Sequence, residues 1–238
     1  MTELSLVSLL ITAATVGIVH TLAGPDHYVP FLAMAKAGKW STARTLTITV
    51  LCGVGHVLGS IALGALGIAL GWSLAPIEQF EGSRGSLAGW LLIAFGAVYT
   101  VWGLRRAHRS HRHTHWHEHD DGTVHAHDHN HALEHGHMHA HTTRQPSMTP
   151  WILFTIFVFG PCEPLIPLLM FPAASLNTFA VVAVAGVFAF CTIATMTTIV
   201  MLARAGLSWF RQPWLERHSH SLAGSAIVAC GLAVQFGL

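Results

Sequence analysis

The sequence predicts an all-α, polytopic membrane protein with six transmembrane helices, arranged as two inverted three-helix repeats with broken first and fourth helices. Three observations predict this fold: the composition, the spacing of the apolar runs and an internal repeat. Of the 238 residues, 52% are hydrophobic and only 10% are charged, whereas soluble domains carry about 25% charged residues. So few charges exclude a soluble enzyme, and we expect no enzymatic activity. The net charge of +1 offers no basic field for nucleic acid.

Six apolar runs of roughly 18 residues or more indicate the membrane spans. Gly24-Pro25 interrupts the first run and Gly160-Pro161 the fourth, and these residues disfavour a continuous helix. The six expected spans are residues 4–34, 45–72, 87–104, 150–173, 178–203 and 221–237.

Two parts of the first half recur in the second half. Residues 86–89 (Ser-Leu-Ala-Gly) recur as residues 221–224 at an offset of 135, and Gly24-Pro25 recurs as Gly160-Pro161 at an offset of 136. Because each half has three spans, the halves would be inverted relative to each other, an architecture of transporters with a substrate site near the midplane. The expected organisation is a first membrane repeat (1–104), a His-rich loop (105–149) and a second membrane repeat (150–238).

Lysine and arginine are confined to one set of connections. Eleven of the twelve lie in the first, third and fifth loops, and Arg84 alone lies in the second. Because loops rich in these residues stay in the cytoplasm, we expect both termini outside it and the His-rich loop inside it. The expected location is the inner or plasma membrane. The N-terminus lacks the basic region and cleavage site of a signal peptide, so the first apolar run is expected to be retained.

The motif His20-Thr-Leu-Ala-Gly-Pro-Asp26-His27 lies late in the first span. A carboxylate in a membrane segment costs about 2.5–3.5 kcal/mol on insertion scales and usually has a partner or lies on a path. Two imidazoles and a carboxylate suit Ni, Co, Zn or Cu, so we expect His20, Asp26 and His27 to bind metal. The alternative is a buried Asp–His pair that only fixes packing.

His56 lies in the second span among Gly53, Gly55 and Gly59. These glycines allow close helix approach, which would place His56 beside the first motif as a further ligand. Alternatively, His56 hydrogen-bonds a neighbouring helix.

Cys162 and Glu163 follow the break in the fourth span and occupy the repeat positions of Asp26 and His27. Across an inverted repeat the two breaks would face each other, so we expect Cys162 and Glu163 to complete the metal pocket. Glu163 could also carry a coupled proton. The alternative is a structural kink whose glutamate bonds to neighbouring backbone.

The third loop holds 14 of the 19 histidines, and most of them alternate with other residues. In an extended chain every second residue points to the same side, so neighbouring imidazoles can chelate one ion. We expect the loop to buffer, capture or sense metal, with a pH sensor as the alternative. The expected loop ligands are His111, His113, His115, His117, His119, His125, His127, His129, His131, His135, His137, His139 and His141.

The motif from His20 to His27 resembles that of the nickel/cobalt transporter superfamily, and most closely its UreH-like, NicO-type branch, in which H-x-L-x-G-P-D-H lies in the first span. The strict permease signature has four residues between the first His and the Asp-His pair, whereas this chain has five, Thr21 to Pro25. The polyhistidine loop is similar to that of the nickel/cobalt efflux relatives. The resemblance implies that His20, Asp26 and His27, and by weaker analogy His56, recognise a divalent transition metal.

The expected function is therefore transport of Ni²⁺ or Co²⁺, with Zn²⁺ as a further candidate, no permanently bound cofactor, and uptake favoured over efflux. No G-x-x-x-x-G-K-[ST] sequence occurs, so energy would come from an ion gradient, the membrane potential or a separate partner. The expected partners are the metal ion, the lipid bilayer and a cytoplasmic metallochaperone. Two rivals are a thiol–disulfide electron carrier based on Cys162 and a membrane-anchored metal buffer in which only the loop binds.

Overall fold

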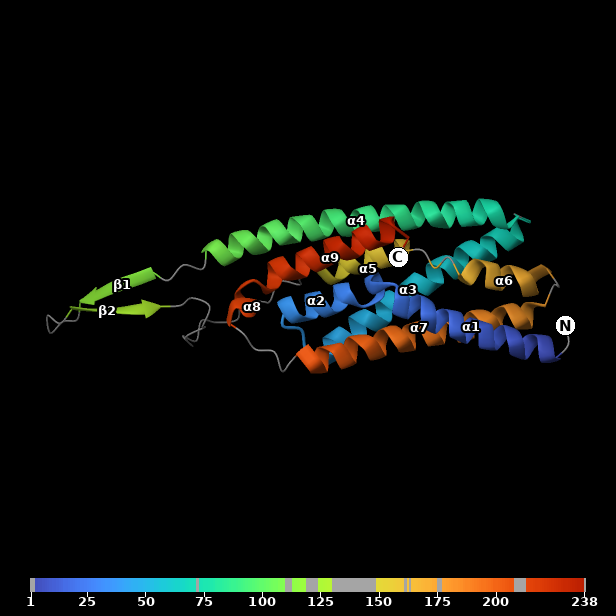
Figure 1. Cartoon of the computed structure of the whole chain (residues 1–238), viewed down its shortest axis with the longest axis horizontal. Helices are drawn as coiled ribbons and strands as arrows, with labels where there is room; N and C mark the ends of the chain where they lie inside the picture. The colour runs from blue at the N-terminus through green and yellow to red at the C-terminus, as the bar shows by residue number, and fades with distance from the viewer. Residues whose placement is uncertain are drawn as a thin grey trace.

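The computed structural model is an elongated bundle of helices with a small hairpin projecting from one end (Figure 1). It describes residues 3–71, 73–109, 113–118, 124–129, 149–160, 162, 164–174, 177–207 and 213–237. Four helices among these residues are long and apolar enough to cross a membrane: Ser5–Ala23, Thr42–Ala69, Leu74–His108 and Thr178–Leu207. The helical, membrane-embedded character of the protein is therefore confirmed.

The first predicted span is a broken helix. Helix α1 (Glu3–Ala23) is followed by a single 3-10 turn, η1 (Pro25–His27), and then by α2 (Val29–Ala37). Gly24 has an extended backbone, with φ −88° and ψ 100°, and Pro25 has no N–H to donate to the helical ladder. The chain therefore breaks where the sequence predicts.

The next two helices are continuous. Helix α3 (Thr42–Ala69) begins after Ser41, whose hydroxyl accepts a hydrogen bond from a backbone N–H of the first turn. Helix α4 (Leu74–Arg109) begins well before the third predicted span. Its added turns carry Glu81 and Arg84, which form an ion pair at i,i+3 spacing. Because the two charges pair, both residues fit in a helix, although the sequence analysis placed Arg84 in the second loop.

The second half contains shorter helices. Helices α5 (Thr149–Phe159) and α6 (Leu165–Ala174) coincide with the fourth predicted span, and α7 (Thr178–Leu207) coincides with the fifth. A short helix, α8 (Pro213–Arg217), precedes α9 (Ser219–Gln235). Because a straight crossing needs about 20 residues, the fourth and sixth predicted spans are not accounted for by helix length.

The described part of the His-rich loop is an antiparallel hairpin of β1 (His113–Glu118) and β2 (Val124–His129). The extended backbone expected for alternating histidines is found in these two segments. Their register pairs histidine with histidine at three positions: His113 with His129, His115 with His127, and His117 with His125. The other predicted loop ligands lie outside the described residues: His111, His119, His131, His135, His137, His139 and His141.

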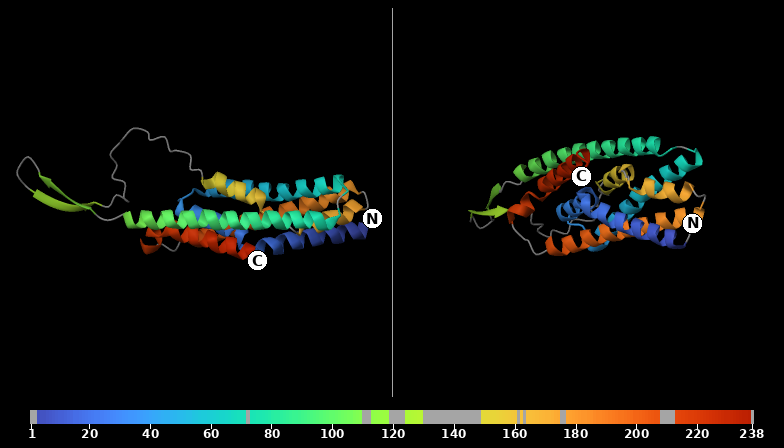
Figure 2. Two further views of the ribbon diagram at one scale, coloured as in Figure 1. Left: turned by 90° about the horizontal axis from the view of Figure 1, so that it is seen from above. Right: turned by 45° about the vertical axis from the view of Figure 1, so that its right-hand side comes forward.

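Helices α4 and α9 lie side by side along the length of α9 (Figure 2). Glycines allow the close approach, since a Cβ on Gly96 would lie 2.7 Å from the Val228 nitrogen and 2.8 Å from the Gly224 carbonyl oxygen. On the other side of the bundle, α1 packs along α7, and α3 packs against both α5 and α7. The interior of the bundle is therefore enclosed by elements from both halves of the chain.

Basic side chains join helix ends at the end of the bundle from which the hairpin projects (Figure 1). The Lys36 amine donates to the Leu207 carbonyl oxygen at 3.1 Å, at the end of α7. Arg217 Nη2 donates to the Ala107 carbonyl oxygen at 3.2 Å, near the end of α4. These contacts neutralise the negative ends of two helix dipoles.

The outer surface of the helices carries large apolar side chains. Phe179 and Phe190 of α7 are each 73% exposed, and Val98 of α4 is 71% exposed. An apolar exterior of this kind suits the hydrocarbon of a bilayer.

Candidate metal centre

Three histidines from three elements meet inside the bundle. His20 lies in the last turn of α1, His27 ends η1, and His56 lies in the middle of α3. The ring centroids of His20 and His27 are 4.8 Å apart, and those of His27 and His56 are 5.1 Å apart. One potential ligand nitrogen of each ring lies within 4.8 Å of the other two. We call these three residues the histidine cluster.

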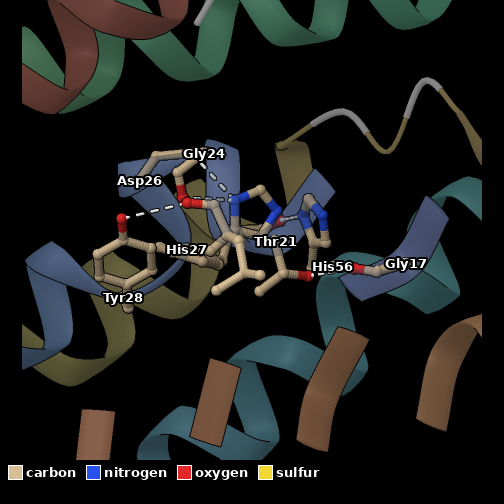
Figure 3. Close-up of polar contacts among 9 residues, drawn as sticks. Gly17, Thr21, Gly24, Asp26, His27, Tyr28 and His56 are labelled. Carbon is tan, nitrogen blue, oxygen red and sulfur yellow. Dashed lines mark hydrogen bonds and ion pairs between the residues drawn. The ribbon is translucent and has the colours of Figure 1, made fainter. Parts of the chain in front are cut away.

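The Nε2 atoms of all three rings are buried and have no hydrogen-bond partner in the described part of the chain. Nδ1 of His27 lies 3.1 Å from the Gly24 carbonyl oxygen and 3.1 Å from Asp26 Oδ1 (Figure 3). Because both oxygens only accept hydrogen bonds, Nδ1 carries the proton, and Nε2 of the neutral ring keeps its lone pair. His56 Nδ1 donates in the same way to the Phe157 carbonyl oxygen, at 3.4 Å.

Buried polar atoms without partners are rare, and each costs about 1–3 kcal/mol. Three such nitrogen atoms converge in the histidine cluster, where His27 and His56 are each only 2% exposed. A transition-metal ion bound between the rings would give all three Nε2 atoms a partner, and imidazole suits Zn, Cu, Fe and Ni. Three protein ligands leave a coordination position open, as in sites that exchange a ligand.

The break after α1 brings the first two histidines together. In a continuous helix, His20 and His27 would lie about 10.5 Å apart along the axis, yet their ring centroids are 4.8 Å apart. The turn depends on Gly24, because a Cβ there would lie 2.6 Å from His27 Nδ1 and 2.7 Å from Asp26 Oδ1. Glycine thus leaves the space in which Asp26 and His27 hydrogen-bond.

Asp26 contacts the histidine cluster through His27. Its carboxylate accepts the Nδ1 proton of His27 and is not one of the three grouped ligands. A carboxylate in this position fixes the tautomer and orientation of a metal-binding imidazole. The structure thus gives Asp26 an orienting contact, where the sequence predicts a ligand.

The second break lies beside the histidine cluster. A Cβ on Gly160 would lie 3.0 Å from His56 Nδ1, so glycine allows the end of α5 to approach α3. Cys162 is fully buried, but it is not part of the histidine cluster. Its backbone N–H donates to the Ser60 hydroxyl at 3.2 Å. Glu163 lies outside the described residues.

An ion pair that the sequence analysis did not single out lies near the same break. Arg84 Nη1 is 2.5 Å from Glu81 Oε1, and the side chains are 12% and 0% exposed. Arg84 Nη2 donates to the Val158 carbonyl oxygen of α5 at 2.8 Å. In the sequence, the opposite charges of Glu81 and Arg84 at i,i+3 spacing indicate a helix over these residues. Nothing in the sequence indicates the contact of Arg84 with α5.

Comparison of the chain with family models, curated proteins and solved structures gives no match.

Proposed function

We propose that this protein transports a divalent transition-metal cation across a membrane, with Ni²⁺ or Co²⁺ as the substrate. The observation that carries this proposal is the convergence of three unpaired Nε2 atoms inside a bundle of membrane-length helices. A transported ion needs ligands that hold it without enclosing it completely. Three imidazoles with an open coordination position meet that need.

The position of the histidine cluster supports transport. It lies where α1 gives way to η1, and the break that follows α5 adjoins it through Gly160. Transporters commonly bind their substrate near the membrane midplane, at broken helices in the interface of two repeats. The backbone freed by such breaks is tolerated only where it is buried in protein or lines a cavity.

Reciprocal contacts support an inverted repeat. The sequence repeat makes Gly89 equivalent to Gly224, and Gly96 equivalent to Gly231. A Cβ on Gly231 would lie 2.7 Å from the Gly89 carbonyl oxygen, and one on Gly224 would lie 2.7 Å from the Gly96 carbonyl oxygen. Each repeat thus offers the same surface to the other, as a two-fold relationship requires.

The packing of whole helices is reciprocal in the same way. On the proposed repeat, α1 would correspond to α5 and α3 to α7. Helix α1 packs on α7, and α5 packs on α3, as this correspondence requires. On this proposal the chain has six spans, both termini outside the cytoplasm, and the hairpin inside it. The hairpin would capture the ion that the histidine cluster delivers, so we propose uptake as the direction.

The resemblance of the motif from His20 to His27 to the nickel/cobalt transporter superfamily supports the choice of metal. A thiol–disulfide carrier gains no support, because Cys162 and the other three cysteines are free and Cys162 is fully buried. A buffer in which only the loop binds would leave the histidine cluster without a role.

The test is metal flux into proteoliposomes of known orientation, with Ni²⁺, Co²⁺ and Zn²⁺ in competition. Wild type should carry Ni²⁺ or Co²⁺, and His27→Ala should carry neither. His218→Ala is the matched control, since the side chain of this partly exposed histidine contacts Trp214, one turn earlier, through its backbone oxygen and its ring. Equal flux through wild type and His27→Ala would refute the proposal. The orientation that supports flux distinguishes uptake from efflux.

A further inference from the structure

We propose that Arg84 is a positioning residue for the histidine cluster, acting through the broken end of α5. This inference rests on the proposed metal binding by the cluster. Arg84 holds the backbone of α5 at Val158, and His56 donates its Nδ1 proton to the preceding carbonyl, that of Phe157. The position of one arginine therefore determines the acceptor that orients one metal ligand.

The contacts of Arg84 and His56 lie at the end of α5, where backbone carbonyl groups need partners from outside the helix. The last carbonyl groups of a helix have no partner within the helix, and in a membrane an unsatisfied carbonyl is costly. Two consecutive carbonyls at this end accept side-chain hydrogen bonds from different helices. Phe157, which also accepts from the Gly160 N–H at 3.0 Å, accepts from His56 of α3, and Val158 accepts from Arg84 of α4. The broken end is thus held between a metal-binding side chain and a charged one.

A glycine makes room for the arginine. A Cβ on Gly59 would lie 2.9 Å from Arg84 Nη2 and 2.9 Å from the Val158 carbonyl oxygen. The guanidinium therefore reaches α5 through space that any larger residue at position 59 would take. Gly59 lies one helical turn from His56 on α3, so this contact and the histidine cluster are neighbours.

The ion pair with Glu81 lowers the free-energy cost of placing Arg84 in a membrane span. An unpaired arginine within a membrane span would be costly, but Arg84 directs Nη1 to Glu81 and Nη2 to Val158. The planar fork of arginine bridges two acceptors in fixed directions, which an amide or an ammonium group does not reproduce. If Arg84 served only to neutralise Glu81, it would not need its hydrogen bond to the Val158 carbonyl oxygen.

Loss of the bridge should let the end of α5 shift, and the Phe157 carbonyl, which the Gly160 N–H ties to this end, should shift with it. His56 would then lose its fixed orientation, and its Nε2 would no longer be held toward the other two rings. Removal of a group hydrogen-bonded to a metal-binding histidine typically weakens metal binding 10–100-fold. Arg84 acts one contact further away, so we expect an effect at the lower end of that range, about a tenfold weaker Co²⁺ affinity of the histidine cluster.

The experiment measures Co²⁺ binding by the purified full-length chain, from the visible absorption of the bound ion. The signal that His27→Ala removes belongs to the histidine cluster, and the remainder belongs to the loop. Arg84→Gln is compared with Arg204→Gln, whose wild-type arginine also donates Nη2 to a backbone carbonyl, that of Trp40, at 2.7 Å. Arg84→Gln should weaken the His27-dependent signal, and Arg204→Gln should leave its affinity unchanged.

A second variant tests the contact without removing a charge. Gly59→Ala should displace the guanidinium from Val158 and weaken Co²⁺ binding in the same way. Gly64→Ala on the same helix is its control, because a Cβ there would meet only Leu169 Cδ1, at 3.4 Å. If Arg84→Gln does not yield folded protein, Gly59→Ala decides alone.

Affinity equal to that of the controls in either folded variant overturns this inference and leaves the proposed function standing. If wild type shows no His27-dependent Co²⁺ binding, the proposed function itself fails, and this inference fails with it. Weakened binding in Arg84→Gln and Gly59→Ala, with both controls unchanged, supports the assignment.

Discussion

The Asp26 carboxylate and the His27 ring, neighbours in sequence, are joined by a hydrogen bond of 3.1 Å between Oδ1 and Nδ1. This bond places the proton of the neutral ring on Nδ1 and leaves Nε2 free to face the other two histidines. Asp26 therefore fixes the orientation of His27, and the three nitrogens grouped within 4.8 Å of one another belong to the histidines alone.

Asp26→Asn should weaken His27-dependent Co²⁺ binding by about 10–100-fold. The neutral amide is a weaker acceptor than the carboxylate, so the Nδ1 proton would be held mainly by the Gly24 carbonyl oxygen at 3.1 Å and the ring would be less firmly oriented. Isothermal titration with Co²⁺ measures the change, and Glu216→Gln, at an exposed carboxylate, is the control. Unchanged affinity would show that the Asp26–His27 bond does not prepare the ring.

Gly24→Ala should also weaken metal binding, because its Cβ would collide with the His27–Asp26 hydrogen bond at 2.6–2.7 Å. Gly186→Ala in α7 is the control, since a Cβ there meets nothing within 4 Å. We expect His27-dependent Co²⁺ absorption to fall in the first variant and to persist in the second. Equal absorption in both would mean that the break tolerates a side chain.

Gly96→Ala should destabilise the bundle by about 1–3 kcal/mol, the usual cost of overpacking. Its Cβ would lie within 2.8 Å of α9 backbone atoms, whereas a Cβ on Gly82 of the same helix would meet nothing within 4 Å. Thermal unfolding in detergent measures the difference, with Gly82→Ala as the control. An unfolding midpoint equal to that of Gly82→Ala would contradict the close α4–α9 contact.

Deleting residues 110–141 should lower the number of Ni²⁺ ions bound per chain while retaining His27-dependent flux. The deletion removes thirteen histidines but leaves α4 and α5 at their full lengths. Equilibrium dialysis measures the bound ions, and the proteoliposome assay measures flux. Complete loss of both would favour a buffer in which only the loop binds.

The sequence allowed the breaks and the site histidines to be predicted, because both depend on local residue types. Gly24-Pro25 and Gly160-Pro161 interrupt apolar runs, and His20, His27 and His56 are the histidines within those runs. Helix α4 begins before the predicted span 87–104, because the apolar run indicates the membrane segment and not the extra turns that carry Glu81 and Arg84. The role of Arg84 could not be predicted, since its partner on α5 lies 74 residues away.

The amino-acid sequence by itself determined that the chain belongs in a membrane, because apolar transfer free energies add along the chain regardless of how the helices pack. It also determined which side chains could bind a metal. Only the tertiary structure decided that three Nε2 atoms converge and that Asp26 orients His27. It also decided that side chains of α3 and α4 donate to consecutive carbonyls at the end of α5. Those outcomes depend on angles at two helix breaks and on contacts between distant residues, which no local pattern specifies.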